Sequence, residues 1–153
     1  MKYMSRTTAR AAVMQMIYEH LEGGEGGEET LHLVYEELRE NGVPGVDRVD
    51  PGEPAKEDRE YIDRVLEGVI GHLEEIDAKI NRAAVGWTTE RMSMIDLTVM
   101  RLAVWEICYE DDIPDSVAIS QALELIGQYS DPSDKSFVNG VLGTVCREFE
   151  AQK

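Results

Sequence analysis

The chain has 153 residues, of which 42% are hydrophobic and 30% charged, and this composition excludes disorder as the default for the whole chain. A chain of this length buries about two-thirds of its unfolded surface, which is enough for one compact core. Thirty-one acidic residues against fifteen basic ones give a net charge of -16. Such a charge repels nucleic acid at long range, which argues against a purely electrostatic DNA or RNA binder.

The first predicted helix runs from Ser5 to His20. Ser5 is a suitable N-cap, and apolar residues recur behind it at helical spacing. The Gly- and Glu-rich stretch 22–28 has no such periodicity and predicts a loop. A second helix is predicted for residues 29–40, followed by a Pro- and Gly-rich connector over 42–54.

One long helix is predicted for residues 55–84, where apolar residues keep a helical stripe. Gly68 and Gly71 lie inside it, and each costs about 1 kcal/mol of helix propensity relative to alanine. Close approach of another helix is the expected compensation at both glycines.

Three further helices are predicted towards the C-terminus. The first covers residues 90–110 with a cap at Thr88 or Thr89, and the second runs through residue 126 with a cap at Asp115 or Ser116. The third opens at residues 131–133. The predicted fold is all-α, with two small helical bundles packed into one compact domain: an N-terminal subdomain over residues 1–50 and a C-terminal one over 51–153.

Patterns for catalysis or metal binding are missing from the sequence. The three histidines are scattered, the glycines at 23–27 lack the flanking residues of a phosphate loop, and no residue stands out as a catalytic base. Cys108 and Cys146 fall in apolar helical patterns and are interpreted as buried thiols. No apolar run is long enough to span a membrane. We therefore expect a cytoplasmic binding protein that is not an enzyme and has no metal or cofactor.

Several ordered motifs resemble the NusB family of transcription antitermination factors. The first is the run from Ser5 to Tyr18, which has Arg-x-x-Ala-Arg, a small apolar pair and Gln-x-x-Tyr in register. More specific marks follow in the C-terminal half: Ile95-Asp96 with Met100-Arg101 and Glu106; Ile113-Pro114 with Val117-Ala118-Ile119, Ala122 and Glu124-Leu125; and Phe137-Val138-Asn139-Gly140-Val141-Leu142. The resemblance extends from Arg6 to Leu142.

The resemblance implies an all-helical fold and a role in transcription antitermination on ribosomal transcripts. Implied partners are boxA-type single-stranded RNA, the ribosomal protein NusE and the transcription elongation complex, and a homodimer of the free protein is left open. The residues implied to bind RNA are Lys2, Arg6, Arg10, Gln15, Tyr18, Asp96 and Phe137. Those implied to face the protein partner are Glu74, Glu75, Asp77 and Ser133.

The sequence departs from the family pattern in three places, one of which is a longer acidic, Gly-rich insert at residues 22–29. Ser120-Gln121 stands where family members commonly have Asn-Glu. Asp134-Lys135-Ser136 stands in place of a usual Ser-x-Lys, which removes a basic group before Phe137. The missing basic group before Phe137 and the acidic net charge favour an alternative function, a helical protein-interaction adaptor with weak or no RNA binding.

Five of the seven predicted RNA contacts have a structural alternative. Arg6 and Arg10 are one helical turn apart, where an RNA phosphate bridges them or both are solvated or paired with glutamate side chains. Tyr18 and Phe137 stack on bases or belong to the core. Asp96 accepts a hydrogen bond from a base, or it pairs with Arg101 or caps a turn.

Three polar or flexible positions in the C-terminal helices are expected to be structural. Arg101 and Glu106 lie in an otherwise apolar helix and should find ion-pair partners there. Asn139-Gly140 lies in mid-helix, where glycine is unfavourable, so either packing or the backbone approach of a ligand must compensate. Packing is the favoured explanation.

Overall fold

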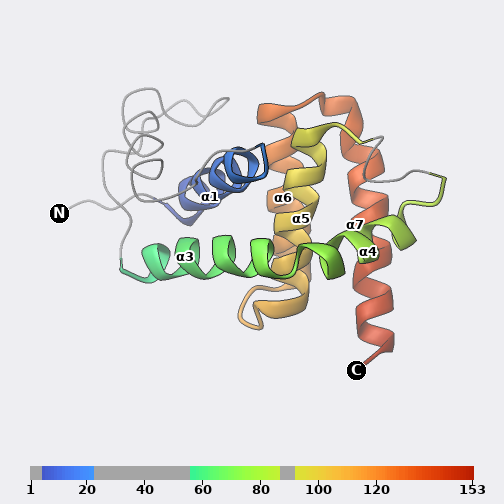
Figure 1. Cartoon of the computed structure of the whole chain (residues 1–153). Coiled ribbons are helices and arrows are strands. Elements are labelled where there is room, and N and C mark those ends of the chain that lie inside the picture. Colours follow the sequence, from blue (N-terminus) through green and yellow to red (C-terminus); the bar gives the residue numbers. More distant parts are fainter. Residues whose placement is uncertain (1–4, 23–55, 87–91) are drawn as a thin grey trace. The chain divides into compact units, whose positions relative to one another are not determined.

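The computed structural model describes residues 5–22, 56–86 and 92–153, and helices dominate these three ranges (Figure 1). The element order is α1 (Arg6–Leu21), α3 (Lys56–Gly71), α4 (Leu73–Ala83), α5 (Met94–Tyr109), α6 (Asp115–Tyr129), the short 3-10 helix η2 (Pro132–Asp134) and α7 (Lys135–Ala151). No strand occurs in the described ranges, and the all-α prediction is confirmed. The helix predicted for residues 29–40 and the connector after it lie outside them.

The chain divides into an N-terminal unit, Met1–Glu67, and a C-terminal unit, Gly68–Lys153. The division falls inside α3. The boundary predicted between residues 50 and 51 lies outside the residues that the structure describes, so it stays a prediction.

Helix α1 begins at the predicted cap. The Oγ of Ser5 accepts a hydrogen bond from the backbone N–H of Thr8 at 3.1 Å, which satisfies one of the free donors of the first turn. The helix ends one residue later than predicted, at Leu21. Ala9, Ala11 and Ala12 are fully buried, and their small side chains allow close packing.

The single helix predicted over residues 55–84 is wrong, because His72 separates α3 from α4. Its backbone has φ -120° and ψ 21°, outside the helical region. Its N–H still donates to the Gly68 carbonyl at 2.9 Å, and the N–H of Ile76 donates to the His72 carbonyl at 2.9 Å. Since both flanking turns keep helical hydrogen bonds, the apolar stripe stays in phase across the break and periodicity does not reveal it.

The two glycines near this break differ. A Cβ on Gly68 would lie 2.2 to 2.6 Å from ring carbons of Trp105, so the predicted close approach is confirmed there. A Cβ on Gly71 would meet nothing within 4 Å, and the prediction is wrong for that residue. Only Gly68 is required by packing.

Helix α5 is the core helix of the C-terminal unit. Every residue from Asp96 to Ile107 is buried, and α5 contacts α4, α6 and α7 (Figure 1). Because apolar residues lie on every side of α5, other parts of the protein must cover it on every side. It begins at Met94, later than predicted, because Ser93 is its N-cap: the Ser93 Oγ accepts from the Asp96 N–H at 3.1 Å. Thr88 and Thr89 lie outside the described residues.

The last two helices confirm the predicted order but not every cap. Pro114, which makes no side-chain cap bond, precedes α6, so the cap predicted at Asp115 or Ser116 is wrong. Asp131 caps η2 by accepting from the Ser133 N–H at 2.9 Å, and α7 follows. Gly140 lies exposed in α7, and a Cβ there would meet nothing within 4 Å, so packing does not explain it.

Candidate functional site

The two arginines of α1 are engaged within the N-terminal unit. The Arg6 guanidinium donates from Nε to Asp58 Oδ1 on α3, and its Cζ lies 4.3 Å from the centre of the Tyr61 ring. Arg10 is only 4% exposed, and its Cζ lies 5.9 Å from the same ring. Arg6 therefore has an acidic partner, although an aspartate and not a glutamate, while 37% of its side chain stays exposed.

The remaining predicted RNA contacts of this unit lie on α1 or before it. Gln15 and Tyr18 are half-buried, so each presents part of its side chain to solvent. Lys2 lies outside the part of the chain that the structure describes. The roles of all five N-terminal residues in RNA binding stay predictions.

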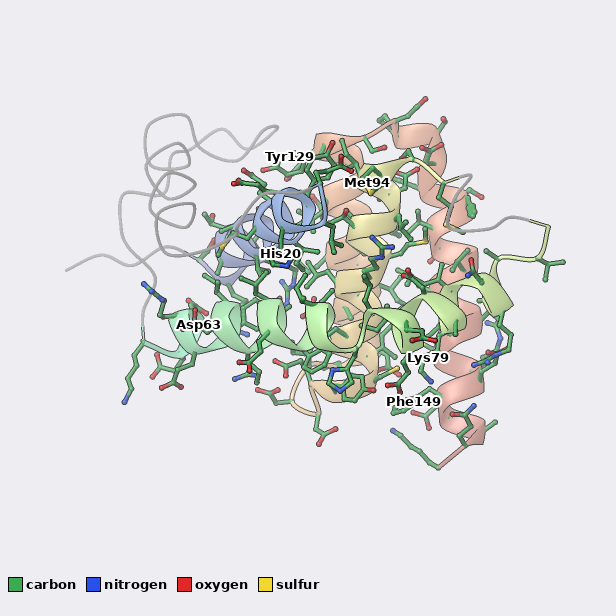
Figure 2. The ribbon with its side chains drawn as sticks, viewed as in Figure 1. His20, Asp63, Lys79, Met94, Tyr129 and Phe149 are labelled. Carbon is green, nitrogen blue, oxygen red and sulfur yellow. The ribbon has the colours of Figure 1, made fainter. Side chains whose placement is uncertain are left out.

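In the C-terminal unit, the start of α5 faces the end of α6. Figure 2 labels Met94 and Tyr129, which lie at the same end of this unit. Ser130, directly after α6, donates from Oγ to Asp96 Oδ1 at 2.6 Å. The Asp134 carboxyl at the end of η2 also hydrogen-bonds to Asp96. The hydroxyl and the second carboxyl thus both converge on Asp96, and the predicted alternative of an Asp96–Arg101 pair is wrong, because Arg101 binds Asp77.

A hollow of about 350 Å³ opens beside Asp96. We call it the Asp96 hollow, and it is lined by Met92, Ser93, Asp96, Met100, Asp134, Phe137 and Val138. It brings together Asp96 and Phe137, two residues predicted separately as RNA contacts. The Phe137 ring is half-buried, so one part packs in the protein and another lines the hollow. The site offers carboxylate acceptors next to an apolar wall.

The hydrogen bond to Asp96 has an electrostatic consequence for Asp134. This bond, with smaller contributions from desolvation and from the charges of Asp96 and Asp131, raises the pKa of Asp134 to about 6. Two neighbouring carboxyls cannot both ionise without repulsion, so the pair holds a proton to higher pH than a lone aspartate. Asp134 was noted in the sequence only as a departure from the family pattern.

The residues predicted to face a protein partner lie on two elements, α4 and η2. Glu74 and Glu75 on α4 are exposed and line a shallow second hollow of about 440 Å³, together with Gly71, His72 and Ala78. Asp77 accepts two hydrogen bonds from Arg101, at 2.8 and 2.7 Å, which confirms the ion pair expected for that arginine. Ser133 is exposed in η2. Partner binding by these four residues stays a prediction.

An aromatic cluster beside the second hollow was not predicted. Trp105 and Tyr109 are stacked with ring centres 4.4 Å apart, and the His72 ring lies 5.4 and 5.1 Å from them. The Tyr109 hydroxyl donates to Glu75 at 2.7 Å, and burial followed by this bond raises the pKa of Tyr109 to about 12. The i, i+4 spacing of Trp105 and Tyr109 was the available signal.

The two cysteines are half-buried thiols, less covered than predicted. Burial raises the pKa of Cys108, and it raises the pKa of Cys146 to about 11. Thiols with raised pKa values are poor nucleophiles at neutral pH. Within residues 5–22, 56–86 and 92–153, no three His, Cys, Asp or Glu side chains are placed to hold a metal ion, and no helix is long and apolar enough to cross a membrane.

Comparisons with known proteins cover nearly the whole chain. The family model described as "NusB family" matches residues 7–147. The "Transcription antitermination protein NusB" of Acetivibrio thermocellus is 38% identical over 94% of this chain and 90% of its own length. The solved structure of NusB from T. maritima is 28% identical, with a TM-score of 0.76 over 95% of this chain and 93% of that one.

A third similarity concerns the fold alone. A structure titled "Crystal Structure of Antitermination Factors NusB and NusE in complex with dsRNA" is 24% identical, with a TM-score of 0.72 over 94% of this chain and 96% of that one. The family model and the A. thermocellus relative extend over both units. This chain belongs to the NusB family.

Proposed function

We propose that this protein is a cytoplasmic transcription antitermination factor that acts by binding and not by catalysis. Together with NusE it binds boxA-type single-stranded RNA of ribosomal transcripts and so acts on the elongation complex. The observation that carries this proposal is the 38% identity to a protein named as a transcription antitermination factor, over nearly all of both chains.

RNA binding by so acidic a protein needs a local site. The first ten residues contain Lys2, Arg6 and Arg10 and no acid, which makes the N-terminus locally basic. We assign phosphate contacts to Lys2 and Arg6, and further RNA contacts to Gln15 and Tyr18, which are half-buried on α1. Arg10 is almost fully buried, so we assign it the role of holding the Tyr61 ring beneath Arg6.

The Asp96 hollow supplies a second kind of contact. Sequence-specific recognition of RNA uses unstacked bases that lie on aromatic rings and hydrogen-bond through their edges. Phe137 and Asp96 line one hollow and offer both functions, a ring and a hydrogen-bond acceptor. We therefore assign base contacts to these two residues.

NusE binding is assigned to the acidic face of α4. Glu74 and Glu75 are exposed beside the second hollow, and their charge would attract a basic ribosomal protein and speed its association at low salt. Asp77 supports this face through its ion pair with Arg101, and Ser133 is an exposed candidate in η2.

The second candidate function is a protein-interaction adaptor with weak or no RNA binding. It is favoured by the ion pair of Arg6 with Asp58 and by the burial of Arg10. A mobility-shift assay with a boxA-type RNA, run with and without NusE, separates the two functions. A shift that NusE strengthens supports antitermination, whereas NusE binding without any RNA shift supports the adaptor.

The partner surface is tested in the same assay by charge reversal. Replacing either Glu74 or Glu75 alone by lysine should weaken NusE binding at low salt. Glu124→Lys is the matched control, because Glu124 is exposed on α6 and lies outside both hollows. An equal effect of the control would reject the α4 surface. Sedimentation of the free protein would test whether it forms a homodimer.

A further inference from the structure

The Asp96 hollow contains two carboxyls that come from different elements. Asp96 belongs to the first turn of α5, and Asp134 ends η2. One oxygen of Asp96 accepts from Ser130 at 2.6 Å, and the carboxyl of Asp134 is bonded to Asp96 as well. Two carboxyls can hydrogen-bond to each other only while they share a proton.

The proton of this pair is lost near neutral pH. The pKa of Asp134 is raised to about 6, chiefly by its bond to Asp96, so at pH 7.5 Asp134 is a carboxylate in most molecules and lies beside the Asp96 carboxyl. Among the described residues, Asp131 adds a further negative charge, and the Lys135 ammonium lies beside Gly127 on α6. A ligand that donates two adjacent hydrogen bonds would relieve this repulsion.

The walls of the hollow suit a planar group. The Phe137 ring, the Met92 and Met100 thioethers and the Val138 side chain line it beside the carboxyls. An aromatic ring and polarizable sulfur atoms pack well against the face of another ring. Its volume of about 350 Å³ is in the range of small-molecule sites.

We propose that the Asp96 hollow takes one unpaired guanine base of a bound RNA, and that Asp134 is the residue that sets this preference. This inference rests on the proposed RNA-binding function. The Watson–Crick edge of guanine presents two neighbouring donors, N1–H and the N2 amino group, which the two carboxylates accept. Adenine places an acceptor, N1, at the corresponding position, and that atom would face a carboxylate.

The test compares single-base changes in one RNA. Fluorescein-labelled uridine 12-mers with one central guanosine, adenosine or inosine are titrated with the full-length protein, alone and with NusE, and binding is followed by anisotropy. At pH 7.5 the guanosine RNA should bind about tenfold more tightly than the adenosine RNA, as for a two-bond base contact. Inosine lacks the N2 amino group, so its RNA should lie between them.

Two variants and one pH change identify the residue responsible. Asp134→Ser should reduce the guanosine-to-adenosine ratio to near one, and so should pH 5 in the wild-type protein, where Asp134 is protonated. Asp63→Ser should keep the ratio, because it removes the same charge from an exposed position on α3 (Figure 2). Circular dichroism checks that both variants are folded.

The outcomes separate this inference from the function on which it rests. Binding of all three RNAs with equal affinity, or an unchanged ratio in Asp134→Ser, overturns the guanine site while the RNA-binding function stands. Failure of every RNA to bind, with or without NusE, overturns both.

Discussion

Arg101 on α5 holds both carboxylate oxygens of Asp77 on α4, with Nε to Oδ1 at 2.8 Å and Nη2 to Oδ2 at 2.7 Å. The Arg101 side chain is only 9% exposed and that of Asp77 21%. A two-bond pair of this kind fixes the orientation of both side chains and ties α4 to the core helix. Its main role is therefore structural, whatever contact the exposed edge of Asp77 makes.

Asp77→Asn should lower the free energy of unfolding by about 3 kcal/mol, because it leaves the buried Arg101 charge without its counterion. Urea denaturation followed by circular dichroism measures the loss. Glu150→Gln is the control: it breaks the exposed Lys153–Glu150 pair and should cost less than about 0.5 kcal/mol. Similar small losses in both variants would show that the buried pair contributes little.

Helix existence was predictable from the sequence, but helix interruption was not. The Ser5 cap and the apolar stripes are local features, and they located α1 correctly. His72 changes only one residue's backbone while hydrogen bonds continue on both sides, so no periodicity argument detects it. The start of α5 was misplaced because Thr88, Thr89 and Ser93 are all suitable caps by residue type.

The candidate site was predictable only in part, because it depends on the tertiary packing of several elements. Asp96 and Phe137 were named from a family resemblance, whereas their shared hollow depends on how α5, η2 and α7 pack. In the sequence, Asp134 was noted only as part of a segment that lacks a usual basic group. Its hydrogen bond to Asp96 cannot be predicted from the sequence. Burial of Arg10 was likewise hidden, because α1 is covered over most of its length.

Two glycine substitutions should change stability in opposite directions. Gly140→Ala should raise the free energy of unfolding by about 0.5–1 kcal/mol, since the site is helical, exposed and open. Gly68→Ala should lower it by about 1–3 kcal/mol, because the new methyl group overlaps the Trp105 ring. Thermal unfolding of the two variants provides the comparison. A stabilised Gly68→Ala would mean that the Trp105 ring can move aside freely.

Asp134 should make stability depend on pH in an unusual direction for an aspartate. Its pKa in the folded protein, about 6, is above the ordinary value of 3.8 for an aspartate, so the folded state binds the proton more tightly. As pH rises from about 4 to about 6, the unfolded chain loses this proton first, and the contribution of Asp134 to stability falls. It then stays constant at higher pH.

Melting temperatures of the wild type, Asp134→Ser and Asp134→Asn, measured from pH 4 to pH 7.5, isolate this effect. Both variants should gain stability relative to the wild type as pH rises through this window. Parallel curves for all three proteins would show that the two carboxyls are not coupled.

Releasing Arg6 should strengthen RNA binding. Asp58→Asn removes the carboxylate that Arg6 binds and leaves its guanidinium available to an RNA phosphate. We expect tighter binding of a boxA-type RNA at low salt, whereas Arg6→Ala should weaken binding and lower the salt slope by roughly 0.7 for the lost phosphate contact. Filter binding over a series of salt concentrations measures both quantities.

Asp63→Asn is the matched control for this experiment, because it removes one negative charge from the same helix beside Arg59 and not Arg6. An equal gain in the two aspartate variants would assign the effect to net charge, and an unchanged slope in Arg6→Ala would remove Arg6 from the interface. A larger gain in Asp58→Asn would instead show that the Arg6–Asp58 pair competes with RNA. That competition would explain how a locally basic helix can be restrained in so acidic a protein, since RNA must displace Asp58 before Arg6 can bind a phosphate.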